Sequence, residues 1–150
     1  MATLHTLLRG VALLSVAALL AGCSPRQLVL NQLADELAAQ GQTSENDLEL
    51  AREASAFYLK FSESVLQPQP AHSGLAASVA GGFTQYAYAF VAFDADRLDA
   101  TDAKAAQRLR ERAARLYRRG RDHALTALDH TYPDLRRQLA DPASPLRIKA

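Results

Sequence analysis

The stretch that decides the fold is residues 73–93, SGLAASVAGGFTQYAYAFVAF. It closes a run of 30 residues, Ser64 to Phe93, without an Asp, Glu, Lys or Arg side chain. A helix that is apolar all round is either buried in a protein core or spans a membrane. The Gly81-Gly82 pair, Thr84 and many alanines favour burial. We therefore expect a buried central helix from a Ser73 cap to Phe93, with a membrane span as the alternative.

The segments on either side of this stretch are amphipathic at helical spacing, and none alternates with the period of a strand. Proline and glycine mark their ends, because proline lacks an amide donor and glycine tolerates the helix C-terminus. The expected helices cover about residues 28–40, 44–66, 102–131 and 134–140. Short connectors between successive helices imply antiparallel neighbours. The sequence therefore predicts an all-α fold of antiparallel helical hairpins, as a bundle or an array.

Two details of these helices can be checked. Ser44 followed by Asp47 resembles a capping box for the second helix, and Thr101-Asp102 is a cap signal for the fourth. The second helix also carries a broad apolar stripe, which we expect to face the core. The stripe consists of Leu50, Ala54, Phe57, Tyr58, Phe61 and Val65.

The first 22 residues have the pattern of an export signal. Arg9 precedes the apolar run Val11 to Leu20, which is too short to span a bilayer. Leu20-Ala21-Gly22-Cys23 follows and resembles the bacterial lipobox, in which the cysteine is acylated and becomes the new N-terminus. We therefore expect residues 1–22 to be a lipoprotein signal peptide and Cys23 the lipid attachment point. The alternative is an ordinary signal peptide with an incidental cysteine.

This anchor sets the expected location. Burying the acyl chains of a lipidated cysteine holds a protein stably on a membrane when two or more chains are present. The protein would then lie in the bacterial cell envelope and face the periplasm. Ser24, rather than an aspartate, after the cysteine favours the outer membrane over the inner one.

Composition and motifs exclude several function classes. The chain has 17 basic and 16 acidic residues, so no global field attracts nucleic acid, and none is expected as a partner. The acidic segment Asp94 to Asp99 fails as a calcium loop, because Leu98 and Asp99 occupy a ligand position and the glycine position. Histidines at metal-ligand spacing, GxSxG, HExxH and P-loop motifs are absent from the sequence. We expect no catalytic residue, no metal and no cofactor, and interpret the protein as a non-enzyme.

A basic face marks the fourth helix. Lys104 to Arg121 contains eight basic side chains and one acid, Glu111. This face is either solvated, with ion pairs along and between helices, or a docking surface for an acidic partner or lipid headgroups. The residues assigned to the docking surface are Arg108, Arg112, Arg115 and Arg119.

The aromatic part of the central helix is the candidate ligand site. Polar-tipped aromatic side chains in an uncharged helix need hydrogen-bond partners or line a pocket. The two adjacent glycines are unfavourable in a helix, which close helix approach or a cavity wall would offset. The cavity residues we assign are Phe83, Gln85, Tyr86 and Tyr88.

The run GGFTQYAYAFV, followed by DADRLD and ARLYRRGRDHALTAL, resembles the T-component (TatT) family of tripartite ATP-independent periplasmic (TRAP) transporters. Members of this family are bacterial lipoproteins, in agreement with Cys23. The resemblance implies tetratricopeptide-like hairpins, a cavity through each subunit and assembly into homotrimers. It also implies association with the substrate-binding P-component, with a hydrophobic ligand passed between them.

This chain is shorter than family members usually are. Residues 23–150 would form a helical domain equivalent to the N-terminal part of a longer family fold. The first hypothesis is a lipid-anchored periplasmic scaffold for a TRAP-type substrate-binding protein. The alternatives are a stand-alone ligand-carrying lipoprotein and a truncated, non-functional remnant.

Overall fold

A computed structural model describes residues 25–39 and 45–141 of the chain. The chain divides into two units, residues 1–33 and residues 34–150, each considered by itself. The first described helix, α2 (Pro25–Ala39), begins directly at Pro25 and runs from the first unit into the second. Proline is well suited to the first helical position, since the amide it lacks would have no partner there. The expected start at Leu28 was therefore three residues late. The lipobox Leu20-Ala21-Gly22 and Cys23 lie outside the described residues.

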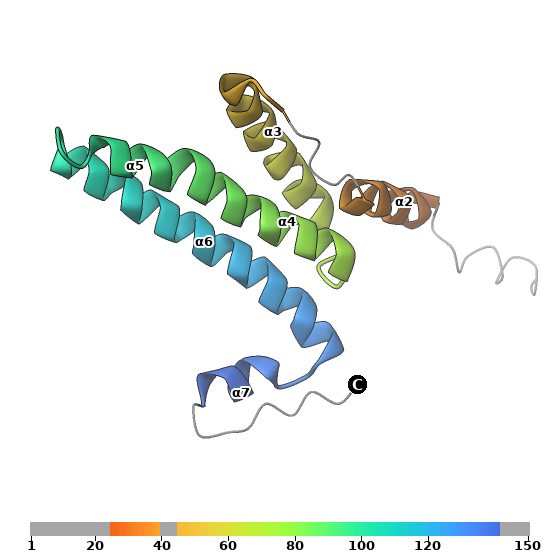
Figure 1. The fold of residues 1–150 in the computed structure, drawn as a ribbon. Coiled ribbons are helices and arrows are strands. Elements are labelled where there is room, and N and C mark those ends of the chain that lie inside the picture. The colour runs from red at the N-terminus through yellow and green to blue at the C-terminus, as the bar shows by residue number, and fades with distance from the viewer. Residues whose placement is uncertain (1–24, 40–44, 142–150) are drawn as a thin grey trace, which may run out of the picture. The chain divides into compact units, whose positions relative to one another are not determined.

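All regular elements of the described residues are helices, which confirms the all-α class (Figure 1). After α2 come α3 (Leu48–Leu66), α4 (Ser73–Tyr86), a π-helix η1 (Ala87–Ala92), α5 (Phe93–Leu98), α6 (Ala103–Thr131) and α7 (Leu135–Ala140). The segment from α4 through α5 lies alongside α6, and a short turn joins the two (Figure 1). The tetratricopeptide-like array stays a prediction.

One of the three N-terminal helix caps is the residue predicted from the sequence, and the other two are different residues. Asp102 caps α6, and its Oδ1 accepts from the Ala105 amide at 2.8 Å, as expected. Asp47, not Ser44, caps α3 and accepts from the Glu49 and Leu50 amides. His72, not Ser73, caps α4: its Nδ1 accepts from the Leu75 amide at 3.1 Å. An acceptor at Nδ1 leaves the ring hydrogen on Nε2, which lies 3.1 Å from Asp35 Oδ1.

The central helix is longer than predicted and changes its winding. The helical backbone continues without a break from Ser73 to Leu98 and passes through a π-helical segment at Ala87–Ala92. At the end of this segment the amide of the next residue, Phe93, donates to Tyr88 O, five residues back. Its core side chains are buried, which favours the buried-helix interpretation: Leu75, Ala76, Val79, Phe83, Ala87, Phe90 and Val91. None of the helices in residues 25–39 and 45–141 has the length and hydropathy that a membrane span requires.

The helices α4 and α6 approach each other closely at Gly120. A Cβ atom at this position would lie 2.9 Å from Ala80 O and 3.1 Å from Phe83 Cβ. Of the glycine pair that the sequence singled out, a Cβ at Gly82 would lie 3.0 Å from Leu59 Cδ1, whereas a Cβ at Gly81 would meet nothing within 4 Å. The close approach that we expected at the pair is therefore made at Gly82 and, more tightly, at Gly120.

The apolar stripe of α3 is only partly buried. Leu59, Val65 and Leu66 are buried, whereas Phe57 is 75% exposed. Phe57 and Phe61 stack on each other, with ring centroids 6.1 Å apart, on the exposed side of the helix. The expectation that this whole stripe faces the core was wrong for Leu50, Ala54, Phe57 and Phe61, because α3 packs on α4 through a neighbouring face.

Candidate functional site

The most polar interior contact of the described residues is built around Glu63 on α3. Its side chain is 4% exposed. Arg119 on α6 donates to both carboxylate oxygens, from Nε to Oε1 at 2.6 Å and from Nη2 to Oε2 at 2.5 Å. His123 Nε2 lies 2.8 Å from Oε1, and Lys60 donates to Oε2. A two-pronged guanidinium contact of this kind fixes orientation as well as charge, so it ties α3 to α6.

Phe83 of α4 supports the α6 side of this network. The Arg119 guanidinium carbon lies 5.0 Å from the Phe83 ring centroid, and the His123 ring stacks on the same ring with centroids 5.9 Å apart. The ring face is electron-rich and attracts the guanidinium. Phe83 is 2% exposed, so the side chain is both a core residue and a platform for the two partners of Glu63.

The network controls the charge of Glu63. Burial by itself raises the pKa of this carboxyl, because a buried charge loses its hydration. The hydrogen bonds from Arg119, Lys60 and His123 act in the opposite direction and prevail, so the pKa falls from 4.5 to about 2. Glu63 is therefore ionised in any near-neutral compartment, and it is saturated with donors. A carboxylate in this state is a poor general base.

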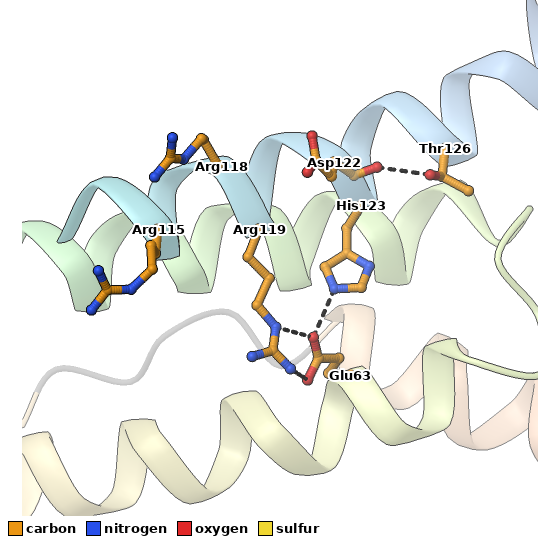
Figure 2. A pocket seen from close by; sticks show the side chains of 7 residues that line it. All are labelled: Glu63, Arg115, Arg118, Arg119, Asp122, His123 and Thr126. Atoms are coloured by element: carbon orange, nitrogen blue, oxygen red, sulfur yellow. Dashed lines mark hydrogen bonds and ion pairs between the residues drawn. The ribbon is translucent and has the colours of Figure 1, made fainter. Parts of the chain in front are cut away.

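A pocket of about 540 Å³ opens beside the network (Figure 2). Figure 2 shows Arg119 and His123 reaching from α6 toward Glu63. Arg115 and Arg118 extend from the same helix and do not contact Glu63. The lining residues are Glu63, Arg115, Arg118, Arg119, Asp122, His123 and Thr126. The lining thus contains three arginines and a histidine against two acids.

A second ion pair joins α3 to the other half of the central helix. Arg52 donates to Asp94 Oδ2 at 2.8 Å and to Asp94 Oδ1 at 3.3 Å. It also donates to the backbone oxygen of Phe90 at 3.0 Å, and its guanidinium lies 5.1 Å from the Phe90 ring centroid. The Arg52 contact lowers the pKa of Asp94. Because Phe90 belongs to η1, Arg52 holds the π-helical segment directly.

The four assigned cavity residues point in different directions. Phe83 is buried beneath Arg119 and His123, and Tyr86 is half-buried and packs on Phe90 with ring centroids 5.4 Å apart. Gln85 is exposed, and Tyr88 is 72% exposed. Phe83 packs against two residues of the pocket described above, Arg119 and His123, and ligand binding by the group of four stays a prediction.

The assigned docking arginines divide into two kinds. Arg108, Arg112 and Arg115 are exposed and make no ion pair or hydrogen bond with any described residue. Arg119 instead forms the internal contact with Glu63. The remaining basic residues of α6 include Arg110, which pairs with Asp99 at 2.8 Å, and Arg121, which pairs with Asp122 at 2.7 Å. The solvated-face interpretation therefore holds for part of the helix, and a free arginine face remains beside it.

Sequence reasoning missed Glu63 and His123. A signal for Glu63 was present: with Leu59, Ser62 and Leu66 it occupies one helical stripe, and these residues are buried. An acid in a core position requires a cationic partner. The partners lie 56 and 60 residues away, and local patterns do not identify them. Among residues 25–39 and 45–141, no three His, Cys, Asp or Glu side chains are grouped as a metal site would require.

Comparisons with known proteins place this geometry in context. The family model described as TRAP transporter T-component matches residues 44–146, more than half of the chain. An uncharacterised protein of Treponema pallidum (strain Nichols) is 32% identical over 137 residues, covering 81% of this chain and 42% of the relative. The chain thus spans less than half the length of that relative. No solved structure matches the chain significantly.

Proposed function

Because the chain belongs to the TRAP transporter T-component family, we propose that it is a lipid-anchored periplasmic scaffold that docks a TRAP-type substrate-binding protein. The family is that of a transporter component, and a non-catalytic role agrees with a donor-saturated Glu63. Docking, rather than transport through the chain itself, is the role that its surface supports.

The observation that carries the proposal is the free arginine face of α6. Arg108, Arg112 and Arg115 lie at i, i+4 and i+7, so they project from one side of a straight helix. They have no acidic partner within the described residues, although many other arginines of the chain do. Unpaired arginines on a rigid helix attract an acidic surface and orient it, since charge complementarity mainly sets the encounter rate and the register.

The anchor is the second part of the proposal. Cys23 precedes α2 by two residues, and an acyl group there would hold the scaffold on a membrane facing the periplasm, the outer one according to the Ser24 signal. Metabolic labelling with a palmitate analogue tests this part. The wild-type chain should carry the label and Cys23→Ala should not, and a labelled Cys23→Ala variant would exclude this anchor.

The docking proposal is tested by capture of a TRAP-type substrate-binding protein from the same organism. The full chain should retain it from a detergent extract, and R108E/R112E should lose it because reversed charges repel an acidic surface. R97E/R137E is the matched control: it changes the net charge equally at exposed positions on α5 and α7. Capture that survives R108E/R112E, or that both variants lose equally, would contradict docking through α6.

The homotrimer that the family resemblance implies is tested separately. Sedimentation of the detergent-solubilised wild-type chain should show a single species with three copies. A monomer that still captures the binding protein would remove trimer formation from the proposal and leave docking intact.

A further inference from the structure

We propose that the pocket beside Glu63 binds a single oxyanion group, a carboxylate or a phosphate, between Arg115 and Arg118. The pocket shares Arg115 with the docking face described above, but Arg118 lies outside that face, and oxyanion binding does not depend on a protein partner. The ligand class follows from the charges that line the pocket and from which of them are already used.

Both acids of the pocket have cationic partners. Glu63 receives Arg119, Lys60 and His123, as described above. Asp122 Oδ1 receives Arg121 Nε at 2.9 Å and Nη2 at 2.7 Å. The hydroxyl of Thr126 donates to Asp122 O at 2.8 Å and accepts from Arg136 at 2.9 Å. Within the pocket lining, the unused charges are therefore positive.

Those unused charges are Arg115 and Arg118. Neither forms an ion pair or hydrogen bond with a described residue, and both side chains are exposed. They lie three residues apart on α6, and Arg115 lies four residues before Arg119, so three like charges occupy neighbouring positions. Like charges at these spacings repel each other along a helix. An oxyanion between them removes this repulsion and accepts hydrogen bonds from both guanidinium groups.

The wall of the pocket is held in place before a ligand arrives. Arg119 is fixed by two bonds to Glu63 and by the Phe83 ring beneath it, so it cannot swing away from the added charge. The fixed wall reduces the ordering that binding requires. Arginine is also the side chain whose planar donors best match a carboxylate or a phosphate, which fits a site with two of them free.

Side-chain ¹⁵N NMR of the full chain tests the site. Inorganic phosphate and acetate are titrated separately at constant ionic strength, and the Nε–H signals of Arg115 and Arg118 should shift saturably. R115Q/R118Q should weaken the affinity about tenfold or more, since each charge-assisted bond to an oxyanion contributes appreciably. R108Q/R112Q removes the same charge from the same helix outside the pocket, and its affinity should stay within about twofold of wild type.

A third arm identifies the source of the oxyanion. Binding to vesicles of equal parts phosphatidylglycerol and phosphatidylcholine, compared with pure phosphatidylcholine, reports a lipid headgroup. Saturable binding of free phosphate or acetate that R115Q/R118Q alone weakens supports a soluble ligand. Binding to anionic vesicles alone, with the same dependence on the variants, supports a headgroup. Equal losses in both double variants, or shifts that rise linearly at all four arginines, would overturn the proposal.

Discussion

The substitution Gly120→Ala tests the contact between α4 and α6. The added Cβ would lie 2.9 Å from Ala80 O and 3.1 Å from Phe83 Cβ. Neither atom is the end of a flexible side chain, so relief requires α4 itself to move. Overpacking of this kind destabilises a fold by about 1–3 kcal/mol. Because the 2.9 Å approach is to a backbone oxygen, the upper part of this range applies, about 2–3 kcal/mol. Alanine returns about 1 kcal/mol through its higher helix propensity, so the net loss should be about 1–2 kcal/mol.

Gly81→Ala provides the matched control within the same pair of helices. A Cβ at Gly81 meets nothing within 4 Å, so only the propensity gain remains, about 0.5–1 kcal/mol of added stability. Gly81→Ala should therefore be more stable than wild type and Gly120→Ala less stable. The free energies of unfolding of the two variants should differ by about 2 kcal/mol, or roughly 10 °C in Tm for a domain of this size.

The assay is equilibrium urea unfolding followed by far-UV circular dichroism, with thermal melting as a second measurement. The urea midpoint should fall for Gly120→Ala and rise for Gly81→Ala at an unchanged slope. A Gly120→Ala variant that is as stable as wild type would refute the reasoning, because it would mean that the two helices separate without loss. Destabilisation by Gly81→Ala would refute it as well.

Three other perturbations probe the remaining contacts. Glu63→Gln should destabilise the fold by about 2–3 kcal/mol, less than for a fully buried pair because Arg119 is half-exposed, as measured by urea unfolding. The same variant tests pH dependence: a carboxylate whose pKa is lowered from 4.5 to about 2 contributes stability that is fully present above pH 4.5 and is lost as pH falls toward 2. The wild-type advantage over Glu63→Gln should therefore shrink across that window, and a constant difference would contradict the ionised state. Arg52→Lys should accelerate amide hydrogen exchange in Ala87–Ala92, since lysine cannot make the paired contact to Asp94. It should reduce the global free energy of unfolding by only about 1 kcal/mol, because both side chains are about one-third exposed. Unchanged exchange would show that Arg52 does not stabilise the π-helix. Leu59→Ala should cost about 2–4 kcal/mol and Phe57→Ala less than about 0.5 kcal/mol, because the first is buried and the second is 75% exposed; equal losses in chemical denaturation would mean that Phe57 is covered.

Local patterns predicted the helices well, because their ends depend on nearby residues. The Asp102 cap and the end of α6 at Thr131 both follow from groups within one turn. The errors in capping have the same local origin. Ser44 and Ser73 are good caps by type, but Asp47 and His72 place an acceptor where the amides of α3 and α4 need it.

The orientation of α3 was less predictable, because its apolar surface is wider than the surface it buries. Phe57 and Phe61 are as apolar as Leu59 and Leu66, and hydrophobicity alone does not choose between the two sets. Glu63 determines which face is buried, because its charge must reach Arg119 and His123 on α6. The face of α3 that carries Glu63, Leu59 and Leu66 is therefore the one that packs in the interior. That choice depends on residues far along the chain, which a local pattern does not contain.

The winding of the central helix was not predicted either. Sequence periodicity describes an average helix, and the change to π-helix at Ala87–Ala92 alters which residues share a face by one position. The expected grouping of Phe83, Gln85, Tyr86 and Tyr88 assumed uniform winding. With η1 present, Tyr88 points to solvent while Phe90 meets Arg52.

The Glu63 contact and the Gly120 contact have a joint consequence for how α6 can slide along its neighbours. A shift of α6 by one turn would bring Leu116 or Ala124 to the place of Gly120, where any Cβ lies 2.9 Å from Ala80 O. The same shift in one direction would present Arg115 and Arg119 to Glu63, and two guanidinium groups can still pair with the carboxylate. In the other direction it would present His123 and Ala127, and the guanidinium contact would be lost. The axial register of α6 is thus specified by shape in both directions and by charge in one, at two points one residue apart on the same helix.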